Sequence, residues 1–238
     1  MLRPEYDVLP MKTCILCCGS LEKEVRLAMN RRQISYPLEI LTDNNHDSPR
    51  RLSASIQNKL DQMDAQRVLM AFGTCGGAMV GLRSGNLTLV IPRVDDCLSL
   101  LMGSMEQRYA LSGGFGLFLT DSWMNHEKSI ESELGRIRSR YPPERADKVI
   151  SALYGHFRSL NVIDTGAYDV ASLLPRSRVL ARQLELEHRV VRGTTAYLEA
   201  LLQGPWESDR FIVIPPNTVI SDADCMMHPH APDSVSLV

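Results

Sequence analysis

The stretch from Val68 to Ser104 decides the fold, and its sequence is VLMAFGTCGGAMVGLRSGNLTLVIPRVDDCLSLLMGS. Its two apolar runs, VLMAF and LTLVIP, are typical of strands buried on both faces of a parallel sheet. Each run ends in a turn that contains a cysteine, Cys75 after the first and Cys97 after the second. A third such turn, Cys17-Cys18-Gly19, follows the apolar run at residues 13–17. We therefore expect three cysteine turns at the carboxyl ends of three strands.

The remainder of the chain alternates between apolar runs and helical patterns. Further strands are expected at residues 38–41, 115–119, 160–163, 188–191 and 211–214. Ser20 and Ser48 are predicted to cap the two helices that follow them, and one helix is predicted from Leu98 to about Tyr109. Alternating strands and helices predict an α/β fold with a largely parallel sheet in Rossmann-like layers.

A polar, charged segment at residues 125–158 interrupts this alternation. Pro142-Pro143 in its middle predicts a helix, a break and a second helix. Two lobes are one interpretation. The N-terminal α/β lobe would span residues 1–124 and carry the cysteine turns, with 125–158 as a helical connection, 159–222 as a C-terminal α/β lobe and 223–238 as a loose tail.

Composition excludes several classes of function. The net charge of the 238 residues is -2, which gives no electrostatic case for binding nucleic acid or an acidic membrane surface. The N-terminus lacks the apolar run of a secretory signal, and no stretch approaches the roughly 20 apolar residues of a membrane-spanning helix. We expect a cytoplasmic protein without a nucleic-acid or membrane partner. In that compartment the six cysteines are buried apolar residues, metal ligands or reactive thiols.

Position distinguishes the cysteines from one another. Ligands of open parallel sheets bind beyond the carboxyl ends of the strands, where Cys18, Cys75 and Cys97 each lie beside Gly or Asp. Cys14 lies inside a strand and is interpreted as core packing. A thiol at a helix N-terminus is expected to have a lowered pKa, which favours the thiolate that metals require. Three unrelated buried thiols remain the alternative.

Three thiolates from separate loops suit two metal centres. A [4Fe–4S] cluster held by three cysteines keeps one iron open for a substrate, and zinc with three sulfurs keeps a fourth position open. The CxxC spacing of zinc ribbons and ferredoxins does not occur in this sequence. The residues alone therefore leave both metals as candidates for Cys18, Cys75 and Cys97.

Other polar residues near the same edge complete the predicted site. We assign catalytic roles to His46, Arg93, Asp95 and Asp96, and substrate binding to Thr74, Gly76, Trp123 and Thr165. Each catalytic assignment has a simpler alternative: His46 is a histidine in a surface turn, the two aspartates cap the helix that begins at Cys97, and Arg93 pairs with those aspartates.

The motifs also resemble those of a family of bacterial and archaeal proteins, common in anaerobes and methanogens, that is defined as a domain of unknown function. The matching motifs are Cys18-Gly19, Gly73-Thr74-Cys75-Gly76, Val90-Ile91-Pro92-Arg93 leading to Asp95-Asp96-Cys97, Thr120 to Trp123, and Asp164-Thr165-Gly166-Ala167-Tyr168-Asp169. The resemblance implies a three-cysteine site and an association with corrinoid methyltransferases. Asp95 stands where the family usually has histidine.

These observations favour a metal-binding protein, with an iron–sulfur cluster as cofactor and zinc as the alternative. We favour an enzyme, a metal-dependent transferase or lyase acting on a small-molecule substrate in one-carbon, methyl-group or sulfur metabolism. One alternative is a zinc-thiolate protein of methyl or thiol transfer. The other is a non-catalytic accessory protein whose two lobes close on a small ligand. A cysteine nucleophile is disfavoured because no histidine is clearly placed as its base.

Overall fold

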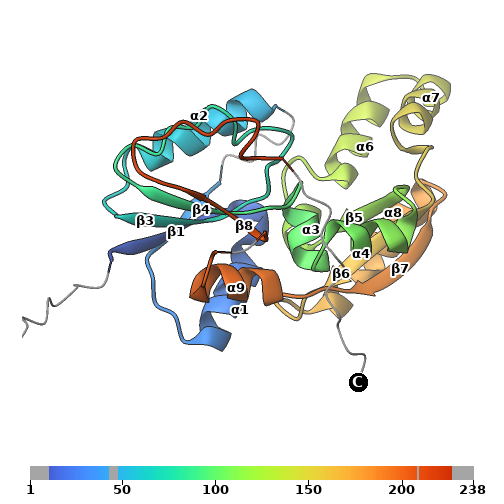
Figure 1. The fold of residues 1–238 in the computed structure, drawn as a ribbon. Helices are drawn as coiled ribbons and strands as arrows, with labels where there is room; N and C mark the ends of the chain where they lie inside the picture. The colour runs from blue at the N-terminus through green and yellow to red at the C-terminus, as the bar shows by residue number, and fades with distance from the viewer. Residues whose placement is uncertain (1–10, 43–47, 208, 227–238) are drawn as a thin grey trace, which may run out of the picture.

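The computed structural model describes residues 11–42, 48–207 and 209–226, and it contains two sheets (Figure 1). The strands are β1 (Thr13–Cys18), β2 (Leu38–Leu41), β3 (Arg67–Ala71), β4 (Thr88–Pro92), β5 (Gly116–Leu119), β6 (Ser159–Asp164), β7 (Glu187–Arg192) and β8 (Phe211–Ile214). The first sheet has the order β2-β1-β3-β4-β8, and the second has the order β5-β6-β7. Every strand pair in them is parallel except β4 with β8. The predicted α/β fold with largely parallel sheets is confirmed.

Helices cover both faces of the first sheet. The helices of the described residues are α1 (Glu22–Arg32), α2 (Pro49–Leu60), α3 (Cys97–Met102), α4 (Met105–Ser112), α5 (Asp121–Met124), α6 (Ile130–Arg140), α7 (Pro143–Tyr154), α8 (Leu174–Gln183) and α9 (Ala196–Gln203). Figure 1 shows α2 on one face of this sheet and α1 with α9 on the other. All six residues of β1 are buried, as expected of a strand covered on both sides. None of the helices in the described ranges is long and apolar enough to cross a membrane.

Local sequence signals explain where α2 and the α6–α7 pair begin and end. Ser48 caps α2 as predicted, because its hydroxyl accepts a hydrogen bond from the backbone N–H of Arg51 at 3.4 Å. The prediction of a helix, a break and a helix after residue 125 is also confirmed. Helix α6 ends before the proline pair, and α7 begins at Pro143, where the missing N–H costs no helical hydrogen bond.

The predicted single helix from Leu98 to Tyr109 is instead two helices, α3 and α4. Gly103 separates them with a φ of 86°, a conformation that favours glycine. Ser104 then caps α4, because its hydroxyl accepts from the N–H of Gln107 at 3.2 Å. The chain therefore changes direction directly after the helix that carries Cys97.

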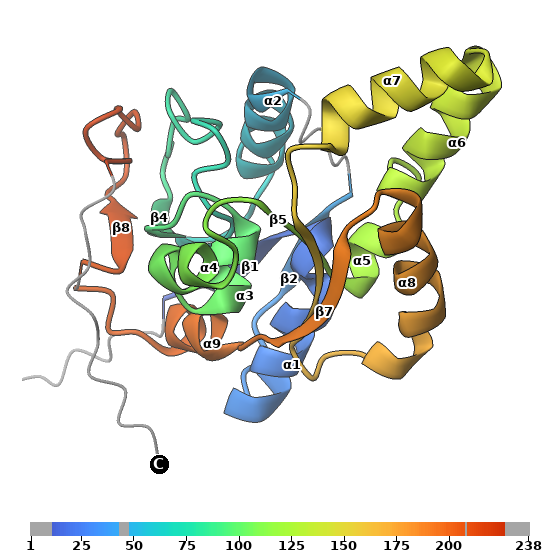
Figure 2. The ribbon, with the colours of Figure 1, turned by 90° about the vertical axis from the view of Figure 1, so that its right-hand side faces the viewer.

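The two sheets interleave along the chain. Strand β5 precedes residue 124 but pairs with β6, and β8 lies near the C-terminus but pairs with β4. Phe118, Ile163 and Val191 of the second sheet belong to the same buried cluster as the strands of the first. In Figure 2, α1 lies between the two sheets. The division into lobes at residues 124 and 159 stays a prediction. The sheets do not follow these bounds, because β5 lies before residue 124 and pairs with β6, which begins at Ser159.

Candidate functional site

Backbone hydrogen bonds join the turn that carries Cys75 to the turn that precedes Cys97. The N–H of Thr74 donates to the carbonyl of Val94 at 2.8 Å, and the N–H of Cys75 donates to the carbonyl of Asp95 at 2.7 Å. These turns follow β3 and β4, which are neighbours in the parallel sheet. The fold therefore brings these two turns together at one edge of the sheet, as predicted.

Gly73 allows the two turns to approach this closely. A Cβ atom at Gly73 would lie 2.6 Å from the Cα atom of Asp96, well inside the ordinary contact distance between carbons. The residues that follow are also unusual, because Cys75 has a φ of 48° and Gly76 a φ of 66°. A cysteine held in the left-handed region is uncommon, and such conformations concentrate at functional sites.

The Cys18 turn reaches the same place through the hydroxyl of Ser20. The Oγ atom of Ser20 lies 3.0 Å from Cys18 Sγ and donates to Cys97 Sγ at 3.7 Å. The predicted role of Ser20 as a helix cap is wrong, because its side chain caps neither the short 3-10 turn at Gly19–Leu21 nor α1. Its hydroxyl instead connects two of the three predicted ligands, and Ser20 itself is buried.

The structure also corrects the expected direction of the thiol pKa values. Burial raises the pKa of Cys75 to about 12, and the nearby Cys18 and Asp96 add to this rise. Burial also raises the pKa of Cys97 well above its usual value, with Cys18 and Cys75 as further causes. The Cys18 pKa is raised by burial as well, against opposing hydrogen bonds from Ser20. Desolvation therefore outweighs any effect of a helix N-terminus, and the thiols are protonated at neutral pH unless a cation binds them.

Of the two aspartates that the simpler alternative assigned to capping, Asp96 caps the helix that begins at Cys97, while Asp95 Oδ1 accepts from the N–H of Asp96 at 2.9 Å. The Oδ1 atom of Asp96 accepts from the N–H of Leu98 at 2.9 Å and from that of Ser99 at 3.1 Å. Its Oδ2 atom accepts from Arg108 at 2.6 Å, and Arg108 also lies 3.4 Å from Asp95 Oδ2. The guanidinium of Arg108 therefore holds the carboxylates beside Cys97.

Arg93 does not take part in this arrangement. Its guanidinium donates to the backbone carbonyls of Asp224 at 3.0 Å and Met226 at 2.8 Å. The alternative pairing of Arg93 with the two aspartates is therefore wrong, and Arg108 of α4 pairs with them instead. Arg93 instead anchors the C-terminal segment against the end of β4.

The predicted substrate-binding residues divide between two places. Thr74 and Gly76 lie in the Cys75 turn, where Thr74 Oγ1 donates to the carbonyl of Asp95 at 3.3 Å. Trp123 lies on α5, which packs against residues 19–21 next to Cys18. Thr165 follows β6, is buried, and donates to Glu24 Oε1 at 3.1 Å. Trp123 and Thr165 therefore lie where the second sheet meets the start of α1.

Glu24 is the most unusual polar residue at this junction. Its side chain is completely buried, and its Oε2 atom has no hydrogen-bond partner in the described part of the chain. Burial raises the pKa of Glu24, while the hydrogen bond from Thr165 and the charge of Lys23 oppose the rise. Lys23 itself forms an ion pair with Asp121 at the start of α5. The first turn of α1 is thus bonded to the ends of both β5 and β6.

His46 lies outside the described residues, so its assignment stays a prediction. Across the described ranges, no three or more His, Cys, Asp or Glu side chains form a group that could hold a metal ion. The Ser20 hydroxyl nevertheless lies within 3.7 Å of the sulfurs of both Cys18 and Cys97.

Four residues of this region were not assigned to the site from the sequence. For one of them, Glu24, the sequence does contain a clear signal. Glu24 falls on the apolar stripe of α1, with Leu21 three positions before it and Ala28 four positions after it. A carboxylate on a buried stripe indicates a partner inside the protein. Gly73, Ser20 and Arg108 do not interrupt an apolar pattern in this way, so no comparable signal indicates their contacts.

Fold and site together define a two-sheet α/β protein with three cysteine turns at the carboxyl edge of its first sheet. The chain belongs to the family described as Protein of unknown function (DUF1638), whose model matches residues 40–202. The predicted membership in a family of this kind is confirmed. The matched range includes Cys75 and Cys97 and begins after Cys18. No curated protein and no solved structure matches this chain.

Proposed function

We propose that Cys18, Cys75 and Cys97 bind a [4Fe–4S] cluster and that the protein is an enzyme acting on a small molecule. The observation that carries this proposal is the hydroxyl of Ser20, which lies within 3.7 Å of the sulfurs of both Cys18 and Cys97. Cys75 lies close enough to both for charge interactions, because Cys18 contributes to the raised pKa of Cys75 and Cys75 contributes to the raised pKa of Cys97. Three loops thus bring thiols together, as the chemistry of a three-cysteine site requires.

The arrangement supports a cluster better than it supports zinc. A single ion needs its ligands gathered at about 2.3 Å from one point. The described side chains form no such group for a metal ion. A cluster spreads three thiolates over three irons and leaves a fourth iron for a substrate. The donor set therefore suits the larger group in type and in number.

The protein residues around the thiols would fix them in place. Gly73 and the two turn hydrogen bonds set Cys75 beside Asp96. Arg108 pairs with Asp96 and Asp95 and offsets part of their negative charge, which disfavours thiolates beside them. The proton that each thiol carries at neutral pH must leave when iron binds, so loading is expected to release protons.

Anaerobic purification followed by iron and acid-labile sulfide analysis tests the proposal. We expect about four irons and four sulfides per chain, with a brown colour. Single serine variants at Cys18, Cys75 and Cys97 should each lower both contents. Cys14→Ser is the matched control, because Cys14 is buried in the same sheet near the opposite end of β1 and should leave both contents unchanged.

Two results would overturn the cluster. A colourless protein without metal after anaerobic purification and reconstitution excludes it, and zinc without sulfide identifies the alternative metal. If Cys14→Ser lowers the iron content as much as Cys75→Ser does, the loss reflects general unfolding. Thermal melting of each variant separates that case from a lost ligand.

The proposed setting is one-carbon, methyl-group or sulfur metabolism, with transferase or lyase chemistry and a corrinoid methyltransferase system as partner. It rests on the motif resemblance alone. A binding assay between the cluster-loaded protein and a purified corrinoid methyltransferase component tests the partner. A complex that needs the loaded form supports it, and no complex in either form rejects it.

A further inference from the structure

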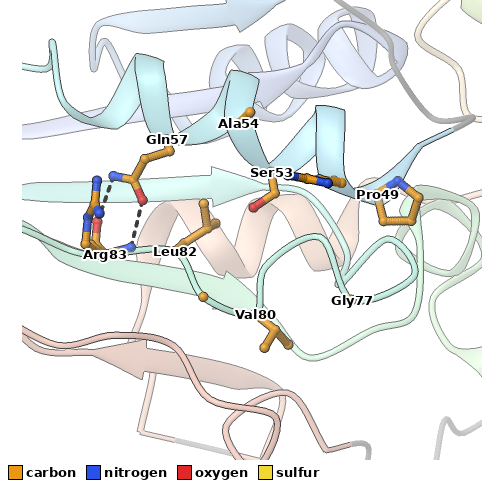
Figure 3. A pocket seen from close by; sticks show the side chains of 10 residues that line it. Pro49, Ser53, Ala54, Gln57, Gly77, Val80, Leu82 and Arg83 are labelled. Carbon is orange, nitrogen blue, oxygen red and sulfur yellow. Dashed lines mark hydrogen bonds between the residues drawn. The ribbon is translucent and has the colours of Figure 1, made fainter.

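A groove of about 430 Å³ runs between helix α2 and the loop at residues 77–83 (Figure 3). Gln57 fixes its two walls to each other, since its Oε1 accepts from the N–H of Arg83 at 2.8 Å and its Nε2 donates to the carbonyl of Arg83 at 3.2 Å. A volume of this size is within the range of small-molecule sites. The two walls of the groove are therefore fixed to each other, and the groove has room for a ligand.

The charged side chains that line the groove are all positive. Arg50 and Arg83 both line it and are exposed, and its described lining includes no acidic residue. Neither arginine forms an ion pair with any part of the chain that the structure describes. Guanidinium groups bind carboxylate and phosphate through paired hydrogen bonds. The lining therefore selects anions.

The two arginines belong to opposite ends of the groove. Arg50 is seven helical positions before Gln57, which corresponds to about 10 Å along the helix axis, and the backbone of Arg83 is bonded to Gln57. Figure 3 shows Arg83 at one end, with Pro49 and Gly77 at the other. Ala54 and Val80 line the groove as well and add apolar surface to it. This arrangement fits an elongated ligand with a charge at each end.

The end formed by Pro49 and Gly77 adjoins the cysteine turns. A Cβ atom at Gly76 would lie 3.4 Å from Cγ of Pro49, so the turn that carries Cys75 is in contact with the first residue of α2. We propose that the groove binds an elongated small molecule with a carboxylate or phosphate group at each end, one bound by Arg50 and the other by Arg83. This site does not depend on the cysteines binding a cluster.

Calorimetric titration of the full chain at low salt tests the site. The probes are succinate, adipate and suberate, which lengthen in that order, and fructose 1,6-bisphosphate as a phosphate-ended molecule. Acetate and inorganic phosphate serve as probes with a single charged end. We expect affinity to rise from succinate to suberate, and Arg50→Gln or Arg83→Gln to weaken the best probe about tenfold. The tighter of suberate and the bisphosphate identifies which anion the groove prefers.

Arg51→Gln is the matched control, because Arg51 is the exposed neighbour of Arg50 on α2 and does not line the groove. It should leave the affinity within about twofold of wild type. An equal loss in Arg51→Gln and Arg50→Gln would show unspecific attraction and overturn the proposal. So would equal affinity for acetate and suberate, or no binding of any probe at about 10 mM. Cys75→Ser should leave binding to the groove intact, so failure of the cluster and failure of the groove give different results.

Discussion

Replacing Gly73 by alanine tests whether close approach of the two turns holds the cysteine site together. The new Cβ atom would lie 2.6 Å from Cα, 2.7 Å from N and 2.8 Å from C of Asp96. Carbon atoms in contact prefer about 3.5–4.0 Å, so the backbones must separate by about 1 Å. All three close atoms belong to the backbone, which means that no side-chain rotation relieves the clash.

The expected cost follows from this overlap. Overpacking of this kind costs about 1–3 kcal/mol. The lower conformational entropy of unfolded alanine offsets about 0.4–1 kcal/mol, since Gly73 does not require a positive φ. The net loss lies between zero and about 2.6 kcal/mol and centres on about 1.3 kcal/mol, which corresponds to a Tm lower by roughly 3–5 °C in a chain of this size.

Thermal melting followed by circular dichroism measures this loss, and iron and sulfide analysis measures its effect on the proposed cluster. Gly135→Ala is the matched control, because Gly135 lies within α6 and a Cβ there meets no atom within 4 Å. That variant should raise stability by up to about 1 kcal/mol. The reasoning would be refuted if Gly73→Ala melted at or above the wild-type temperature.

Two further predictions concern charged groups. Because burial raises the pKa of Glu24 above its unfolded value of 4.5, its contribution to stability is fully present below that pH and is lost as pH rises through the folded pKa. Glu24→Gln, which is neutral at every pH, should therefore gain stability over wild type as the pH rises above 4.5. Urea unfolding at a series of pH values measures this gain, and Glu22→Gln, at the more exposed ion pair with Arg26 on the same helix, is the control for loss of a carboxylate. Arg108→Gln and Asp96→Asn, combined in a double-mutant cycle, should show a coupling of about 0.5–1 kcal/mol in the free energy of unfolding, because both side chains are only partly exposed. Additive effects would show that the ion pair does not stabilise the Cys97 turn.

The sequence was sufficient to predict that the three cysteine turns share one edge. The apolar runs before them indicate buried strands, and parallel strands place all their following turns on the same side. It was not sufficient to predict the partners of β5 and β8. A short apolar run shows that a strand is buried, but the pairing of β8 with β4, more than a hundred residues earlier, depends on tertiary packing.

The polar contacts of the site were harder to predict for a related reason. Arg108 and Arg93 are both arginines near Asp95 and Asp96 in the sequence, and only the direction of α4 after Gly103 decides that Arg108 is the partner. The thiol pKa values were predicted in the wrong direction because the sequence shows that a cysteine precedes or begins a helix and does not show how deeply it is buried. Cys97 is the first residue of a helix of six residues, and its exposed fraction is 6%.

Helix α1 makes the geometry of the cysteine site depend on both sheets. Its first turn follows Cys18 closely in the chain, and there Lys23 binds Asp121 after β5 while Glu24 binds Thr165 after β6. Close-packed interiors transmit displacements instead of absorbing them. A shift of the second sheet against the first would therefore move the start of α1, and with it the Cys18 turn. Cys75 and Cys97 would stay together, because their turns are bonded directly to each other. The position of the Cys18 turn is thus tied to the second sheet through α1, whereas the turns of Cys75 and Cys97 are tied to each other.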